Sequence, residues 1–142
     1  MNIAIGCDHA GYELKEEIIK QLKELGHTTN DFGAFGLDSV DYPDHGHQVC
    51  NDIEAGNADC GILICGSANG MTMTANKHEG IRCALCWVPE VAALARQHNN
   101  ANSIALPALF ISKELAKDIV RAYLEAEFEG GRHQRRVDKI ND

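Results

Sequence analysis

Short apolar runs alternate with longer amphipathic segments along the chain, and this alternation limits the fold more than any other feature. Residues 2–6, 60–65, 82–86 and 103–106, with a weaker run at 28–32, have the length and composition of strands. The run at 60–65 has no apolar–polar alternation, which is typical of a strand buried on both faces. Strands that alternate with helices form a parallel sheet covered on both sides, so we expect an α/β fold.

The amphipathic segments are predicted helices. In the first of them, Leu14, Ile18 and Leu22 recur at helical spacing. Pro89 fits the first turn of a later helix, and Ser112 is placed to cap another. The predicted helices cover residues 11–25, 45–55, 70–77, 89–98, 112 to about 128, and 132–140.

Length and charge narrow the class of protein. A chain of 142 residues suits one domain, 1–142, and is long enough to bury a core. Its net charge of −8 argues against nucleic acid or an anionic membrane as a partner. No apolar run approaches the ~20 residues of a membrane span, and the first residues do not resemble a signal peptide. We therefore expect a cytoplasmic protein whose six cysteines are reduced.

Cys65 ends the most apolar strand and enters a loop of small residues, Gly66, Ser67, Ala68, Asn69 and Gly70. A helix is predicted to begin there, and its N–H groups and dipole favour negative charge. A thiol in this place can have a lowered pKa and supply a usable thiolate. We interpret Cys50, Cys60, Cys83 and Cys86 as small buried hydrophobic residues, whereas the loop favours a function for Cys65.

The glycines of this loop could hold an anion on their backbone N–H groups, although the pattern is neither a dinucleotide motif nor a P-loop. Next to a thiol that removes a proton beside a carbonyl, such donors would stabilise an oxyanion. Cys83 and Cys86 have the spacing of a redox motif. Residues three apart in a strand point to opposite faces, so we expect neither a disulfide nor a shared metal.

Ligands of parallel sheets bind beyond the carboxyl ends of the strands. We expect Asp8 and His9, the Cys65 loop, and the region of His98 and Asn99 to lie at those ends. Helix capping explains Asp8 and Asn99 equally well from the sequence alone. His98 suits a general acid and base because imidazole titrates near neutrality.

The segment EGGRHQRRV, residues 129–137, is the most basic stretch of this acidic chain. Arg132 and Arg136 are four residues apart and share one face of a helix. Two guanidinium groups on one face suit a phosphate dianion. A solvated helix with surface salt bridges is the alternative interpretation.

Taken together and in order, these stretches resemble type B ribose-5-phosphate isomerases, within the wider family that includes galactose-6-phosphate isomerase subunits. The arginine-bearing tail favours the pentose-phosphate branch. The resemblance covers nearly the whole chain and rests on IAIGCDHAG (3–11), DYPD (41–44), GILICGSANGM (61–71), ANKHEGIRCAL (75–85), RQHNNANSIAL (96–106), ELAKDIV (114–120) and EGGRHQRRV (129–137).

The resemblance implies a three-layer α/β/α sandwich around a five-stranded, Rossmann-like parallel sheet. It implies an isomerase that interconverts ribose 5-phosphate and ribulose 5-phosphate through a cis-enediolate, without metal or cofactor. A homodimer with shared active sites is implied, and pairing of dimers into tetramers stays open. Cys65 resembles the base that moves a proton between C1 and C2, and His98 the group that opens the furanose ring. The implied sugar contacts are Asp8, His9, Tyr42 and Asn99, with residues 66–70 on the enediolate oxygens and Arg132 and Arg136 on the phosphate.

Two departures from the family pattern leave the sugar open. The family loop is commonly Cys-Gly-Thr-Gly-x-Gly, whereas Ser67 here keeps the hydroxyl and is followed by Ala68 and Asn69. Leu109 stands after the fifth strand, where the family often has an arginine. An isomerase of allose or galactose 6-phosphate is therefore an alternative.

Two other classes of protein are less consistent with the sequence. A cysteine phosphatase would place an arginine six residues after the thiol, where Met71 stands. A non-catalytic domain that binds a nucleotide or another phosphate ligand would not require Cys65.

Overall fold

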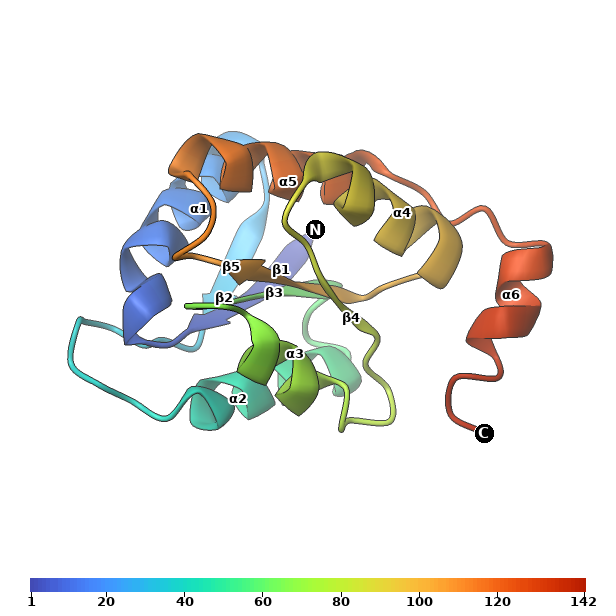
Figure 1. Ribbon diagram of the computed structural model, residues 1–142, viewed down its shortest axis with the longest axis horizontal. Coiled ribbons are helices and arrows are strands. Elements are labelled where there is room, and N and C mark those ends of the chain that lie inside the picture. The colour runs from blue at the N-terminus through green and yellow to red at the C-terminus, as the bar shows by residue number, and fades with distance from the viewer.

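The computed structural model describes residues 1–142 as a five-stranded sheet with helices on both faces (Figure 1). The strands are β1 (Asn2–Cys7), β2 (Thr28–Asp31), β3 (Cys60–Cys65), β4 (Cys83–Leu85) and β5 (Ser103–Pro107). The helices are η1 (His9–Gly11, a 3₁₀ turn), α1 (Tyr12–Glu24), α2 (Tyr42–Glu54), α3 (Asn69–Ala75), α4 (Pro89–Asn99), α5 (Lys113–Glu125) and α6 (Arg132–Val137). No helix combines the length and the apolar composition needed to cross a membrane.

All five strands are parallel, in the order β2-β1-β3-β5-β4. The chain leaves β1 toward one edge of the sheet and returns past it to β3, so the strand order reverses between these two strands. Cys7 and Cys65 lie at their carboxyl ends. Such a reversal leaves a crevice outside the strand ends, which is where open α/β sheets bind ligands.

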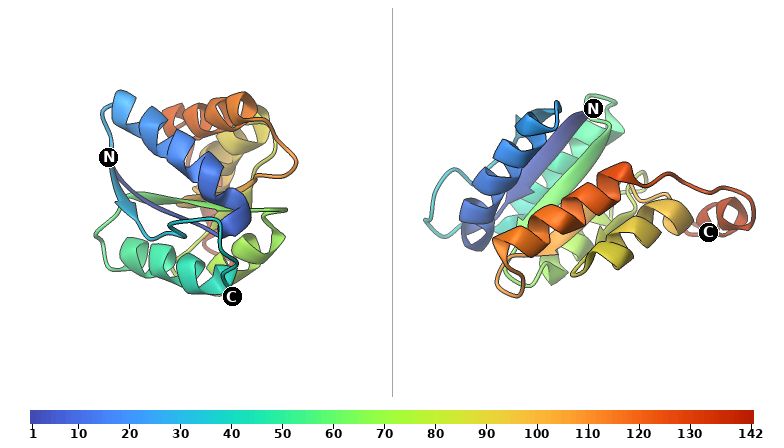
Figure 2. Two further views of the ribbon diagram at one scale, coloured as in Figure 1. Left: turned by 90° about the vertical axis from the view of Figure 1, so that its left-hand side faces the viewer. Right: turned by 90° about the horizontal axis from the view of Figure 1, so that it is seen from above.

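Helices α1, α4 and α5 cover one face of the sheet, and α2 and α3 cover the other (Figures 1 and 2). Strand β3 contributes to both cores: Ile62 and Ile64 belong to a core of 20 buried residues, whereas Leu63 and Cys65 belong to a second of 12. Burial on both faces explains why residues 60–65 show no polar alternation. The expected three-layer α/β/α sandwich is confirmed.

Most helix ends agree with the sequence signals. Ser112 accepts the N–H of Leu115 at 3.0 Å and caps α5, and Pro89 begins α4. Helix α2 starts at Tyr42, before the predicted residue 45, because Pro43 fits an N-terminal turn in which its missing N–H costs nothing. Helix α5 ends before the predicted residue 128, α6 ends before 140, and β4 is shorter than the predicted 82–86.

A buried ion pair ties α1 to the end of β2. Lys15 has no exposed surface, and its Nζ lies 2.7 and 2.8 Å from the two carboxylate oxygens of Asp31. Asp31 also accepts the N–H of Gly33 at 2.9 Å, and the Lys15 ammonium lies 4.9 Å from the centre of the Phe35 ring. The pair therefore fixes the start of the segment that leads from β2 to Tyr42.

Helix α6 stands at one end of the molecule, beyond α4 and apart from the sandwich (Figures 1 and 2). The chain reaches it through Gly130 and Gly131, whose φ angles of +67° and +55° lie in the left-handed region that glycine tolerates. The N–H of Glu129 donates to the carbonyl of Gln97 at 3.0 Å and holds this connection against α4.

Candidate active site

The turn after β1 is held against the end of β3. Asp8 accepts the N–H of Gly11 on Oδ1 at 3.0 Å, so the capping interpretation is confirmed, while its Oδ2 has no hydrogen bond within the chain. The N–H of Asp8 donates to the carbonyl of Ile64 at 3.1 Å. A Cβ at residue 11 would lie 2.8 Å from that same carbonyl oxygen, so only glycine permits this close approach. The packing places the Asp8 carboxylate near Cys65.

His9 joins this turn to the segment that carries Tyr42. Its Nδ1 accepts the N–H of Val40 at 3.3 Å, and Nε2 has no partner within the chain. The neutral ring therefore presents an N–H at Nε2, because the nitrogen that accepts a hydrogen bond carries no proton. His9 can donate this hydrogen bond to a ligand in the crevice.

Cys65 is 5% exposed. Burial is the largest influence on the pKa of its thiol and raises it, and the Asp8 carboxylate raises it further. The backbone N–H groups of Met71 and Ala68 lower the pKa, but the net effect is a raised pKa. The expectation of a lowered pKa is therefore wrong, because loss of water at a buried strand end outweighs the N–H groups of the loop. At neutral pH Cys65 is a thiol in this chain.

The loop after Cys65 is compact and internally bonded. Ala68 has a φ angle of +66° and is fully buried, a left-handed conformation that costs a residue with a Cβ about 1–2 kcal/mol. Ser67 accepts the N–H of Asn69 on Oγ at 3.3 Å, and the Thr72 hydroxyl donates to the Ala68 carbonyl at 2.7 Å. These bonds hold the loop in one conformation.

Tyr42 and Leu109 border the loop on either side. A Cβ at Gly70 would lie 2.7 Å from the Tyr42 hydroxyl oxygen, so the tyrosine ring lies directly on the glycine backbone. The N–H of Leu109 donates to the carbonyl of Gly66 at 3.1 Å, and its side chain is 71% exposed. The position where related proteins were expected to carry arginine thus adjoins the loop, and here it is apolar. Asp8, His9, Tyr42 and residues 65–70 form one cluster, which we call the thiol half-site.

His98 and Asn99 do not belong to this cluster. They end α4, which returns the chain from β4 to the start of β5. A helix between two parallel strands runs back along the sheet, so its last residues lie at the amino ends of the strands. The prediction that His98 and Asn99 lie at the carboxyl ends of the strands, beside Cys65, is wrong for this reason. The Asn99 carbonyl accepts the Arg82 Nε–H at 3.2 Å, a contact that helps to cap α4.

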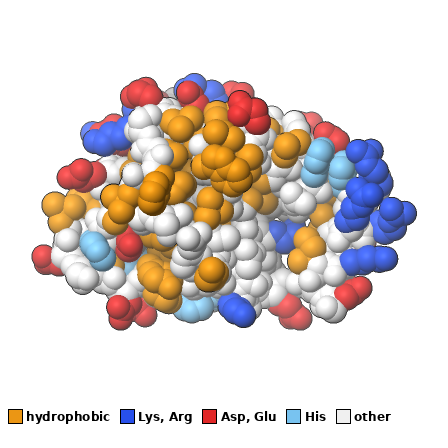
Figure 3. Space-filling model, in the orientation of Figure 1, with side chains coloured by type: hydrophobic (Ala, Val, Ile, Leu, Met, Phe, Trp, Pro, Cys, Tyr) orange, Lys and Arg blue, Asp and Glu red, His pale blue; other side chains and the backbone are white.

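Helix α6 adds its cations beside His98. The His133 ring stacks on the His98 ring, with centroids 4.2 Å apart and planes inclined by 11°. A Glu129 carboxylate oxygen lies 3.8 Å from His98 Nε2 and 3.4 Å from His133 Nε2. Arg132 and Arg136 are exposed on α6, and basic side chains gather with histidine at this end of the molecule (Figure 3). We call His98, Asn99, Glu129, Arg132, His133 and Arg136 the histidine half-site.

Sequence analysis missed Glu129 and His133. Both stand in the segment that suggested a phosphate grip, but nothing local ties them to His98. Burial lowers the pKa of His133, and the charges of His98 and Arg132 lower it further. His133 is therefore a neutral imidazole at neutral pH.

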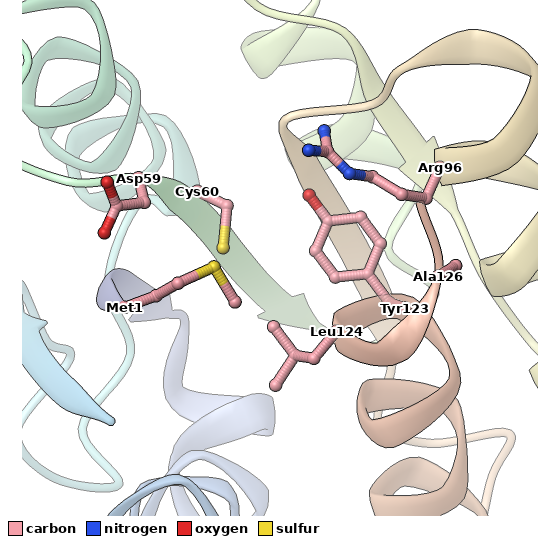
Figure 4. Close-up of a pocket in the computed structure, with 7 residues that line it drawn as sticks. All are labelled: Met1, Asp59, Cys60, Arg96, Tyr123, Leu124 and Ala126. Atoms are coloured by element: carbon pink, nitrogen blue, oxygen red, sulfur yellow. The ribbon is translucent and has the colours of Figure 1, made fainter. Parts of the chain in front are cut away.

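A cavity of about 380 Å³ also lies on the sandwich, far from Cys65 in the sheet, at the amino end of β3 (Figure 4). The polar side chains that line this cavity already have hydrogen-bond partners within the chain. Arg96 donates to Asn100 Oδ1 at 2.7 Å, and Tyr123 donates to the Ala101 carbonyl at 2.7 Å. Asp59 accepts the Asn2 N–H at 2.7 Å. These bonds hold the ends of α4 and β1, so the polar groups serve the fold.

All six cysteines are free and buried. Cys83 and Cys86 belong to the two different cores, on opposite faces of the sheet. The expectation that this pair forms no disulfide is confirmed.

The model of the family described as Ribose/Galactose Isomerase matches residues 3–140. The chain belongs to this family. The match to the Ribose/Galactose Isomerase family includes both half-sites. Ribose-5-phosphate isomerase B of Escherichia coli (strain K12) is 46% identical over 138 residues, which cover 97% of this chain and 93% of that protein.

Two solved structures of the family share the fold. A ribose 5-phosphate isomerase from Thermotoga maritima has a TM-score of 0.97 and 48% identity, covering 99% of this chain and 97% of that one. Ribose-5-phosphate isomerase B from Mycoplasma genitalium, solved with bound ribulose-5-phosphate, has a TM-score of 0.94 and 44% identity, covering 99% of this chain and 93% of that one.

Proposed function

We propose that this chain is an aldose–ketose isomerase that interconverts ribose 5-phosphate and ribulose 5-phosphate, and that a second copy of the chain completes its active site. The proposal rests on the separation of the two half-sites, which lie at opposite ends of the strands. The carboxyl ends hold a buried thiol among backbone N–H donors, and the amino ends lie beside imidazole and guanidinium groups. Relatives named for this reaction, one of them solved with ribulose-5-phosphate, support the choice of substrate.

The thiol half-site is suited to moving a proton between adjacent carbons. Cys65 is a thiol at rest, so it must first lose its proton to solvent. The resulting thiolate takes the proton from C2 of open-chain ribose 5-phosphate, and the electrons of that C–H bond form the cis-enediolate. Return of the proton to C1, with transfer of the O2 hydroxyl proton to O1, gives ribulose 5-phosphate. A raised pKa makes the thiolate a stronger base once it has formed. The N–H groups of residues 66–70 would hold the enediolate oxygens.

The histidine half-site is suited to ring opening and to the phosphate. His98 can take the proton of the O1 hydroxyl and deliver one to the ring oxygen. Neither Arg132 nor Arg136 forms an ion pair within the chain, since every salt bridge involves other residues. Unpaired, exposed guanidinium groups favour a phosphate grip over the alternative of a helix stabilised by surface salt bridges.

The carboxyl ends of the strands, where Cys65 lies, present an apolar surface that a second copy could cover. Trp87, Leu109 and Phe110 are 52%, 71% and 75% exposed, and all three follow strands β4 and β5 at their carboxyl ends. Large apolar side chains exposed together mark contact surfaces in soluble proteins. In a two-fold dimer, each histidine half-site would meet the thiol half-site of the other chain, giving two equivalent sites.

The choice of sugar depends on Leu109 and the loop. A cation at residue 109 would lie beside Gly66, and leucine supplies none. Ribose 5-phosphate and allose 6-phosphate should therefore be assayed side by side, with EDTA present because the proposed reaction uses no metal. A kcat/KM higher for allose 6-phosphate would replace the pentose by a hexose. A cysteine phosphatase would carry an arginine six residues after the thiol, and a fully buried methionine, Met71, stands there. This residue argues against a cysteine phosphatase and against a loop that binds a phosphoryl group.

Subunit mixing tests the shared site. Cys65→Ala and His98→Ala should each be nearly inactive, because a positioned acid or base is worth about 10²–10⁴-fold in rate. Mixed dimers would carry both lesions in one site and neither in the other. With random pairing, about a quarter of all sites regain wild-type composition. Native mass spectrometry confirms that mixed dimers form. If they form and activity stays at the single-mutant level, the two residues do not act in one site across the dimer.

A further inference from the structure

The histidine half-site contains three groups of the kinds that bind transition metals. His98, Glu129 and His133 offer two imidazole nitrogens and one carboxylate oxygen, all within 4.8 Å of one another. They come from the end of α4, the connecting segment and α6, so folding brings His98 against Glu129 and His133, which are themselves an i,i+4 pair. The N–H of Glu129 on the Gln97 carbonyl, 3.0 Å, fixes the segment between the two histidines.

The His133 ring carries a second, independent sign of a missing ligand. The residue is 6% exposed, and its Nε2 is buried without a hydrogen-bond partner. Buried polar atoms are nearly always paired, so an unpaired nitrogen calls for an explanation. The Nε2 atom lies 3.4 Å from Glu129 Oε1, at the right separation for two ligands of one ion but without hydrogen-bond geometry.

We propose that His98, Glu129 and His133 form a binding site for a divalent transition metal of the zinc class. Zinc takes imidazole and carboxylate ligands at about 2.0–2.2 Å, which places tetrahedral ligand atoms roughly 3.3 Å apart. The contact between His133 and Glu129 already has this length. The 3.8 Å contact between His98 and Glu129 is about 0.5 Å too long. The His98 and His133 rings are stacked nearly parallel, so their lone pairs, which lie in the ring planes, do not converge in this conformation. Binding therefore requires the partly exposed His98 to rotate out of the stack toward Glu129 and His133.

Charge sets the character of this site. Two neutral imidazoles and one carboxylate leave a bound dication with a net positive charge, and Arg132 and Arg136 lie nearby on α6. Both arginines disfavour positive charge at His133 and so weaken the binding of a cation, although their exposure to solvent reduces this effect. Three protein ligands also leave the fourth position to water or to an anion from solution. The site therefore binds the metal reversibly and does not enclose it as a structural zinc site would.

A metal bound here would inhibit the enzyme. It would occupy the Nε2 lone pair of His98, and an imidazole that ligates a metal cannot accept the proton needed for ring opening. This consequence rests on the proposed function, whereas metal binding itself does not. Zinc would thus lower turnover of the ring-closed sugar, and EDTA would restore it.

The test begins with isothermal titration calorimetry of zinc into the EDTA-treated, dialysed full chain, which requires no turnover. Wild type should bind one zinc per chain, and His133→Asn and Glu129→Gln should each weaken binding by more than about tenfold. Glu129 is half exposed, so Glu129→Gln keeps the test valid if His133→Asn fails to fold. Glu127→Gln removes the same charge from the same segment without touching a histidine and should bind as wild type does.

A second histidine pair provides a further control. His47 and His78 hydrogen bond to each other at 2.7 Å on the other face of the sheet, and His47→Asn should leave zinc binding unchanged. Absence of one-to-one binding in wild type would overturn the proposal, as would loss of binding in His47→Asn or Glu127→Gln. If zinc binds at the expected stoichiometry but does not slow turnover, the metal site stands and the role of His98 in the reaction is wrong.

Discussion

Replacing Lys15 by alanine should destabilise the fold more than any other single change to a charged residue discussed above. The lysine is fully buried and its ammonium pairs with Asp31, whose side chain is 27% exposed. Removing one partner of a buried ion pair costs about 3–5 kcal/mol, and partial exposure of Asp31 favours the lower value, about 3 kcal/mol. Three buried methylenes are lost as well, at about 0.8 kcal/mol each. Lys15→Ala should therefore lower the free energy of unfolding by about 5 kcal/mol.

Two related variants separate these contributions. Lys15→Met keeps most of the apolar volume and loses only the charge, so it should cost about 3 kcal/mol. Adding Asp31→Asn removes the uncompensated carboxylate but keeps an acceptor for the Gly33 N–H. The double variant should come within about 1 kcal/mol of wild type. Lys20→Ala is the control, because that side chain is 70% exposed on the same helix and should change stability by less than about 0.5 kcal/mol.

Urea unfolding followed by circular dichroism, with linear extrapolation to water, measures these differences. All variants should be compared at one protein concentration, since assembly would add to apparent stability. The reasoning is refuted if Lys15→Ala costs less than about 1 kcal/mol, or if Asp31→Asn fails to rescue Lys15→Met. Either result would mean that water or another group stabilises the unpaired carboxylate.

Three further predictions concern the half-sites. Because the pKa of Cys65 is raised, its alkylation by iodoacetamide, followed by peptide mass spectrometry, should still increase about tenfold per pH unit between pH 7 and 9; a plateau below pH 8 would contradict this. Gly70→Ala should displace the Tyr42 ring, raise KM and cost about 1–3 kcal/mol in stability, whereas Gly36→Ala, which has open space around it, should do neither. Arg136→Ala should raise KM for the phosphorylated sugar by roughly 10-fold or more, the loss of one charge-assisted contact, and an unchanged KM would remove it from the phosphate grip.

The fold was predictable because each of its elements is encoded locally. The uninterrupted apolar run at β3 required burial on both faces. Pro89 in the first turn of α4 and the Ser112 cap of α5 marked the two helix starts within a turn. The start of α2 was predicted at residue 45 instead of Tyr42 because residues 42–44 lack apolar periodicity, although Pro43 allowed a helix start there.

The site was only partly predictable, since its chemistry depends on distances that the sequence does not encode. The loop of Cys65 was recognisable, but whether its N–H groups or its burial dominates the thiol pKa depends on packing in three dimensions. The position of His98 could have been found by following the chain direction through α4, which must end where β5 begins. Glu129 and His133 gave no signal, because only folding places them against His98.

The position of α6, outside the sandwich and at the opposite end from the Cys65 loop, determines how activity should depend on enzyme concentration (Figure 1). If each chain holds half of a site, a dissociated chain has no activity at any concentration of sugar. Dilution below the dissociation constant of the dimer should then make the rate fall with the square of the protein concentration instead of linearly. Such an enzyme would be switched off by scarcity of its own chain, and the steepness of the dilution curve would measure the strength of its assembly.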